Sequence, residues 1–200
     1  QRMDAICERA EEILNKPGFA EAFKANLKKG WYSLSTPIMA NFGLKRGLPI
    51  SCFGSSVDDT SESIVQTWGE VFMMTKHGGG TSGFFGKIRH RGAAITDNGE
   101  SSGSVHFMGA FDFLINLVSQ GKTRRGNFAA YLPIDHPDIM EFLNLQLEGN
   151  PIQDLMFAVC VSDKWMEEMI AGDPVKRKVW ARVLERRQEK GLPYIFFTDN

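Results

Sequence analysis

Residues 48–89 read LPISCFGSSVDDTSESIVQTWGEVFMMTKHGGGTSGFFGKIR, and their pattern indicates the fold class. The short apolar run at 48–53 predicts a buried strand, and residues 84–89 predict a second strand. Between them, Asp59 is followed three residues later by Glu62, the spacing of a capping box, which predicts the start of a helix. A strand–helix–strand unit of this kind is typical of an α/β fold with parallel strands.

The predicted helix after Asp59 has one apolar face, because Ile64, Trp68 and Phe72 recur at four-residue spacing, and the glycines at 78–80 end it. The same criteria predict helices over residues 4–27 (interrupted at 17–18), 105–118, 163–170 and 175–190, and a further helix introduced by 135–138 and ending at 147. They predict an extended stretch over 31–42 and strands over 128–132, 155–161 and 194–197. This alternation predicts one α/β domain with a largely parallel sheet.

Composition excludes several classes of protein. The 200 residues are 42% hydrophobic and 24% charged, which is ordinary globular usage and excludes a disordered chain. The formal net charge of −1 implies no polyanion-binding surface, so we expect no nucleic-acid partner. No apolar run reaches the roughly 18 residues of a membrane span, and no secretory signal is visible. We expect a cytoplasmic protein without a membrane partner.

The three cysteines are an odd number without the spacing of a disulfide framework or a zinc site, so we predict no metal site and a reducing compartment. Cys7 and Cys160 lie in apolar patterns and are predicted core residues. Two interpretations of Cys52 stay open: a core cysteine, or a redox thiol whose partner lies elsewhere. The histidines also lack metal-ligand spacing, and His136, in a helix-start turn, is interpreted as structural.

Two glycine-rich stretches have features of phosphate-binding loops. In residues 78–83 (GGGTSG), consecutive glycines allow backbone N–H groups to approach an anion; the alternative is a helix end with a flexible loop. Residues 119–127 (SQGKTRRGN) carry three cations, which suits phosphate; the alternative is a solvated basic loop. With Arg89 and Arg91 nearby in sequence, the pattern favours a small phosphorylated ligand over a nucleic-acid groove.

Several motifs together resemble the large, catalytic subunit of ribonucleotide reductase. They are, in order, STPIM (35–39), PISC (49–52), DDTSESI (58–64), GGGTSG (78–83), KIR (87–89), SSG (101–103), QGKTRRG (120–126), HPDI (136–139) and PYIF (193–196). Each motif is weak alone, but their order and spacing are specific. The resemblance implies the first half of a ten-stranded α/β barrel of the ribonucleotide reductase type over residues 31–200, after a short helical segment over 1–30.

The resemblance implies an enzyme that reduces ribonucleotides to deoxyribonucleotides by thiyl-radical chemistry. In the family one cysteine forms the thiyl radical, and two others donate electrons and become a disulfide. Cys52 matches the first electron donor; the other two cysteines are expected after residue 200, so the chain as given lacks the thiyl-radical cysteine and the later half of the barrel. The residues that match the family's substrate site are Thr36, Ser51, Gly80, Gln120 and Arg124.

The resemblance also implies that an effector, a deoxynucleoside triphosphate or ATP, controls which substrate is reduced. The matching effector-site residues are Asp59, Thr60, Ser61 and, on the effector's phosphates, Arg89. The loop at 93–102 would help to enclose the effector, and residues 120–127 would relay its identity to the substrate site. The helix over 60–75 matches the family's dimer-interface helix, which implies a homodimer.

Further partners follow from the same resemblance. The radical source is either a small subunit that carries a dimetal centre or adenosylcobalamin. The disulfide formed in each turnover must be reduced again, which implies a thioredoxin- or glutaredoxin-type reductant. The alternative interpretation is a non-catalytic nucleotide-binding or subunit-interaction module, in which Cys52 would carry no redox function.

Overall fold

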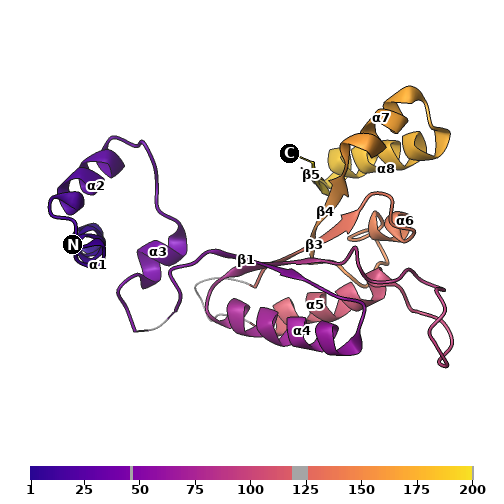
Figure 1. Cartoon of the computed structure of the whole chain (residues 1–200), viewed down its shortest axis with the longest axis horizontal. Helices are drawn as coiled ribbons and strands as arrows, with labels where there is room; N and C mark the ends of the chain where they lie inside the picture. Colours follow the sequence, from indigo (N-terminus) through magenta and orange to yellow (C-terminus); the bar gives the residue numbers. More distant parts are fainter. Residues whose placement is uncertain (46, 119–125, 200) are drawn as a thin grey trace.

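The computed structural model describes residues 1–45, 47–118 and 126–199 (Figure 1). Its centre is one sheet of five parallel strands: β1 (Cys52–Ser56), β2 (Gly80–Phe84), β3 (Phe128–Pro133), β4 (Met156–Val161) and β5 (Tyr194–Phe197). The strands follow one another across the sheet in chain order. Right-handed crossovers that all step in one direction place their helices on one face, as in a barrel and unlike a doubly wound sheet. The predicted α/β half-barrel is confirmed.

Helices α4 (Ser61–Lys76) and α5 (Ser104–Leu117) form the crossovers between β1, β2 and β3, and they lie together along one face of the sheet (Figure 1). The indole Nε1 of Trp68 in α4 donates to the carbonyl of Ala110 in α5 at 3.0 Å, which joins the two helices. Under them, the ring of Phe111 stacks on Phe128 at 4.8 Å and meets the edge of Phe85 at 5.3 Å. These buried aromatic contacts attach α5 to the sheet.

The two faces of the sheet differ in composition because successive strand residues point to opposite sides. The helix-covered face carries the core residues Phe128, Ala130, Leu132, Phe157, Val159 and Val161. The opposite side of β1 to β3, here called the open face, carries Cys52, Gly54, Ser56, Gly80, Ser82, Phe84, Ala129, Tyr131 and Pro133, which are exposed or half-buried. Small and polar side chains therefore line the open face where β1 and β2 begin.

The C-terminal part continues the pattern. Helices α7 (Asp163–Ala171) and α8 (Pro174–Lys190) connect β4 to β5, and a short helix, α6 (Ile139–Phe142), follows β3. Trp165 is buried against Trp180, with ring centroids 6.2 Å apart. Arg186 of α8 is fully buried, and its Nη2 donates to the carbonyl of Leu145 at 2.8 Å. This bond ties α8 to the turns that follow α6.

Three helices precede the sheet: α1 (Arg2–Leu14), α2 (Phe19–Lys28) and α3 (Thr36–Asn41). The Arg2 guanidinium donates to the carbonyls of Met39 and Phe42 at 2.8 and 2.9 Å, which holds α3 against α1. An apolar cavity of about 260 Å³ lies among these helices, with Ile6 and Phe23 in its lining. A domain boundary after residue 30 stays a prediction. No helix within the described ranges is long and apolar enough to cross a membrane.

Two predicted strands are displaced along the chain. The strand predicted at 48–53 is β1, so Cys52 begins the strand instead of lying near its end. The strand predicted at 84–89 is β2, so much of the glycine-rich stretch expected to form a loop is strand. The hydrophobicity pattern misplaced both strands, because the open-face residues of β1 and β2 are mostly small or polar instead of apolar. Within β2, Gly83 allows the Phe128 ring to pack against the strand, since a Cβ at position 83 would lie 2.8 Å from the Cζ of Phe128.

One extended stretch and one helix were also predicted wrongly. Residues 31–42 were predicted as extended but contain α3, which begins after the extended N-cap Ser35. Pro37 fits its first turn because the N–H that proline lacks would have no helical partner there. The helix predicted to end at 147 is only α6, followed by turns. The helices predicted at 105–118, 163–170 and 175–190 and the strands at 128–132, 155–161 and 194–197 are confirmed to within one residue at each end.

The predicted capping role of Asp59 was wrong. The N-cap of α4 is Thr60, whose Oγ1 accepts a hydrogen bond from the Ser63 N–H at 3.1 Å. The Asp59 carboxylate is occupied elsewhere, because it binds the Arg89 Nε at 2.6 Å. A long-range ion pair thus displaces the local capping box.

We predict that Gly83→Ala destabilises the protein by roughly 1–3 kcal/mol, since the added methyl group would overlap the Phe128 ring in a packed core. Gly109→Ala in α5 is the matched control. There the new Cβ would meet only Ile152 atoms at 3.8 Å, so the higher helix propensity of alanine leaves stability equal or raised. Urea unfolding measures both variants; equal stability of Gly83→Ala and the parent would contradict the packing role.

Candidate functional site

Cys52 lies at the amino end of β1, on the open face. It is exposed, and its Sγ lies 3.3 Å from the Oγ of Ser51. The Ser51 carbonyl accepts a hydrogen bond from the Gly80 N–H at 2.7 Å, and Cys52 pairs with Gly80 across the two strands. Three of the predicted site residues therefore lie together. The exposed position of the thiol contradicts the core interpretation of Cys52.

The surface around this thiol is built from small side chains. Gly54 and Ser82 are the next open-face pair beyond Cys52 and Gly80, and the Ser82 Oγ donates to the Phe53 carbonyl at 3.2 Å. Backbone and hydroxyl groups can therefore approach a polar ligand beside the thiol. An accessible cysteine can form a mixed disulfide or a new disulfide with a partner thiol, which a buried cysteine cannot do.

Of the remaining predicted substrate residues, only Thr36 lies within the described ranges. Thr36 is the first residue of α3, among the N-terminal helices, and within the described ranges no hydrogen bond joins it to Cys52 or Ser51. Gln120 and Arg124, with most of the relay loop predicted at 120–127, lie outside the described residues.

The predicted effector residues gather at the opposite, carboxyl edge of the sheet. The Asp59 carboxylate accepts from the Arg89 backbone N–H at 3.2 Å and from the Arg89 Nε at 2.6 Å. The Arg89 Nη1 also donates to the Ala94 carbonyl at 3.2 Å, inside the predicted enclosing loop. Thr60 caps α4 and exposed Ser61 begins it. Cation, carboxylate and helix N-terminus thus meet at one place, which suits an anionic ligand with hydroxyl groups.

Residues missed by sequence reasoning lie next to this cluster. Asp138 is buried and hydrogen-bonded to Arg91 and Ser104, which come from the two ends of the loop around 93–102. His136 is buried beside it and hydrogen-bonded, in agreement with its structural interpretation. The signal in the sequence is the HPDI motif at 136–139, which belongs to the resemblance and to a predicted helix start but does not indicate the partners of Asp138.

The other two cysteines are buried, as predicted. Burial raises the pKa of the Cys160 thiol to about 11. Burial, and next the charge of Glu8, raise the pKa of Cys7. Both thiols are therefore protonated near neutral pH, and neither is accessible for disulfide exchange.

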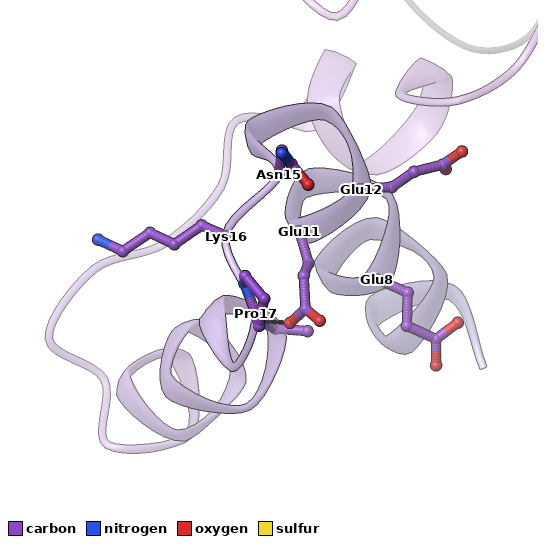
Figure 2. Close-up of a pocket in the computed structure, with 7 residues that line it drawn as sticks. Glu8, Glu11, Glu12, Asn15, Lys16 and Pro17 are labelled. Atoms are coloured by element: carbon purple, nitrogen blue, oxygen red, sulfur yellow. Dashed lines mark hydrogen bonds between the residues drawn. The ribbon is translucent and has the colours of Figure 1, made fainter.

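A separate hollow of about 280 Å³ lies on the N-terminal helices, and none of the predicted site residues lines it (Figure 2). The residues that line it are Glu8, Glu11, Glu12, Asn15, Lys16, Pro17 and Ala20. Glu11 accepts a hydrogen bond from the Ala20 N–H at 2.8 Å, so this carboxylate connects α1 to α2. Among the described residues, no group of three or more His, Cys, Asp or Glu could hold a metal ion.

A chain-order parallel sheet with helices on one face and an accessible thiol on the other defines an α/β-barrel protein with a cysteine on the barrel's inner side. Residues 50–176 match the family described as "Ribonucleotide reductase, barrel domain". The chain belongs to the ribonucleotide reductase large-subunit family.

Individual relatives agree with this assignment. The α subunit of the class Id ribonucleotide reductase of Actinobacillus ureae superposes with a TM-score of 0.89 and 49% identity, over 99% of this chain and 36% of that one. The ribonucleoside-diphosphate reductase large subunit of Invertebrate iridescent virus 6 is 33% identical over 86% of this chain and 20% of its own length. A vitamin B12-dependent reductase of Mycobacterium tuberculosis (strain CDC 1551 / Oshkosh) is 31% identical over 81% of this chain and 24% of its own. The chain thus spans about a third or less of each relative.

We predict that iodoacetamide at pH 8 modifies Cys52 of the folded protein well before Cys7 or Cys160. Cys52 is exposed, whereas burial both shields the other two thiols and raises their pKa values, so that little of their reactive thiolate forms. Mass spectrometry of tryptic peptides after short reaction times measures the order. Equal modification of Cys160 would show that its burial is wrong, and the same reaction in guanidinium chloride should remove the difference.

Proposed function

We propose that the chain is part of an enzyme that reduces ribonucleotides to deoxyribonucleotides in the cytoplasm, with Cys52 as one of its two electron-donating thiols. The overall step balances when two thiols lose two electrons and two protons to become a disulfide. One proton leaves with the ribose 2′-hydroxyl as water, and the two electrons and the other proton form the new C2′–H bond. Membership of the family supports this proposal. The observation in the structure that carries it is the exposed Cys52 thiol on the open face, beside Ser51 and the backbone of Gly80.

We propose that Asp59, Thr60, Ser61 and Arg89 form the binding site for an effector, a deoxynucleoside triphosphate or ATP. The Asp59–Arg89 pair supports this assignment, because both side chains are about one-third exposed and can exchange partners with a ligand. The guanidinium suits the effector's phosphates and the carboxylate suits its sugar hydroxyl groups. Substrate binding is proposed for Ser51 and Gly80 and, by position in the sequence, for Thr36, Gln120 and Arg124.

The proposed partners rest on exposed apolar side chains of α4 and α5 and on sequence identity to known reductases. Val65 and Met73 of α4 and Phe113 and Leu117 of α5 are exposed apolar side chains, which supports a homodimer through these helices. Identity is higher with the class Id α subunit than with the vitamin B12-dependent enzyme, 49% against 31%. We therefore place a separate radical-generating subunit ahead of adenosylcobalamin as the radical source. A thioredoxin- or glutaredoxin-type protein would reduce the disulfide again.

The test of the catalytic proposal is Cys52→Ser in the complete enzyme, with a dithiol as reductant. Turnover should fall to background, because serine cannot form the disulfide. Cys160→Ala is the matched control, since Cys160 also lies on a strand of this sheet but is buried; it should retain turnover. Wild-type turnover of Cys52→Ser would favour the alternative of a non-catalytic nucleotide-binding module.

A second variant tests the effector site. Arg89→Ala in the complete enzyme should raise the dissociation constant of a deoxynucleoside triphosphate about tenfold or more, since hydrogen bonds to charged groups contribute roughly 1.5–3 kcal/mol. Equilibrium binding measures this constant, and competition between substrates shows whether the effector still changes the preference. Arg182→Ala, which removes an arginine from the surface of α8, should bind the effector as the parent does. Unchanged affinity in Arg89→Ala would contradict the assignment.

A further inference from the structure

A buried carboxylate connects two ends of the loop beside the effector cluster. Asp138 lies just after β3 and before α6, and it is 6% exposed. Its Oδ1 accepts a hydrogen bond from the backbone N–H of Arg91 at 3.0 Å. Its Oδ2 accepts from the backbone N–H of Ser104 at 2.9 Å and from the Ser104 Oγ at 3.0 Å. One side chain thus binds residues that lie 47 and 34 positions away in the chain.

His136 connects the same turn to the turn that follows β2. Its Nδ1 lies 3.1 Å from the Asp138 backbone N–H, which can only donate, so Nδ1 accepts. The proton is then on Nε2, which donates to the Ile88 carbonyl at 2.9 Å. The ring in this tautomer is neutral, so its 4.0 Å approach to the Asp138 carboxylate is not an ion pair. Ile88 immediately precedes Arg89, so this bond locates the backbone of the arginine.

The loop between Arg91 and Gly103 folds back on itself through one antiparallel bridge, Ala94 with Glu100, and Asp138 binds the two ends of the loop. Gly92 donates to the Ser101 carbonyl at 2.9 Å, and Ser101 donates to the Ala93 carbonyl at 2.8 Å. Gly103 has a φ of 87°, and a Cβ there would lie 2.9 Å from both Arg91 and the Asp138 carboxylate. Close approach of the two loop ends to Asp138 therefore requires a glycine at this position.

The Asp138 carboxylate is held in its charged form. Burial alone would raise its pKa, but the hydrogen bonds from Arg91 and Ser104 more than offset burial and lower the pKa. A charged carboxylate can accept from all three donors at once, whereas an amide in its place would direct an NH₂ group at N–H donors. It also stands at the N-terminus of α5, where the N-cap Gly103 has no side chain to satisfy the first N–H groups.

We propose that Asp138 is a positioning residue of the effector site, which sets the place of Arg89 and of the enclosing loop at 93–102 without touching the nucleotide. This inference rests on the proposed function and extends it to a residue outside the matched effector segment. Arg89 is held from two sides: Asp59 fixes its side chain and backbone N–H, while Asp138 and His136 fix the backbone on either side of it. Loss of the Asp138 carboxylate would free the two ends of the loop but would keep the Asp59–Arg89 pair.

The test is Asp138→Asn in the complete enzyme, with Asp135→Asn as matched control, since exposed Asp135 lies in the same turn and loses the same charge. Asp138→Asn should raise the dissociation constant of a deoxynucleoside triphosphate about tenfold, which is the effect of losing about one hydrogen bond to a charged group. Asp135→Asn should leave this constant unchanged. Trypsin should cleave Asp138→Asn faster after Arg89 and Arg91 but not after Lys190, at the end of α8. Unchanged affinity and cleavage would overturn the proposal.

The remaining outcomes are also decisive. Faster cleavage at every site together would show a general structural role and overturn the positioning role. If Asp138→Asn does not fold, Ser104→Ala replaces it; removing one of three donors should raise the dissociation constant about threefold, and parental affinity would overturn the proposal. A parent enzyme that binds no deoxynucleoside triphosphate would refute the proposed effector function, whereas selective cleavage in Asp138→Asn would still show that Asp138 holds the loop.

Discussion

The parallel pairing of β1 with β2 places the two candidate sites relative to each other. Because both strands run the same way, Cys52 meets Gly80 at one edge of the sheet, and Ser56 meets Phe84 at the other. The two pairs are four residue steps apart along the strands, a distance on the order of 13 Å at about 3.3 Å per residue. Asp59 follows the end of β1 and Arg89 follows the end of β2, so their ion pair joins the two segments that leave the carboxyl ends of these strands. One strand–helix–strand unit therefore carries the thiol at one end and the Asp59–Arg89 pair at the other.

The division between the two faces explains the unusual composition of these strands. The face under α4 and α5 is filled by phenylalanine and branched aliphatic side chains, which supply the buried apolar area that stabilises the sheet. The open face carries glycine, serine and cysteine where β1 and β2 begin, and these residues contribute little to packing. A strand with one such face does not show the hydrophobic run of a strand buried on both sides. Two of the residues that weaken the strand pattern, Cys52 and Gly80, are among those proposed for the substrate site.

Prediction succeeded where the deciding interactions are local. The periodic helices at 105–118 and 175–190 and the apolar strands at 128–132 and 155–161 were found because their patterns repeat within a few residues. It failed at Asp59, which has the spacing of a capping residue but binds Arg89, thirty residues away. In the candidate site, the motif order predicts roles for Cys52 and Arg89. It gives no role to Asp138, although HPDI is one of the motifs, because the partners of Asp138 lie 34 and 47 residues away.

The amino-acid sequence was sufficient to establish the α/β class, the resemblance to the ribonucleotide reductase large subunit, and the burial of Cys7 and Cys160, since each depends on composition, periodicity or motif order. The folded chain was needed to show that Cys52 faces the open side of the sheet. A one-residue change of strand register would turn the thiol toward the helices. It was needed equally for the Asp59–Arg89 pair and for Asp138 at the base of the loop. Contacts between distant segments depend on strand order and register, and neither is written in any short stretch of residues.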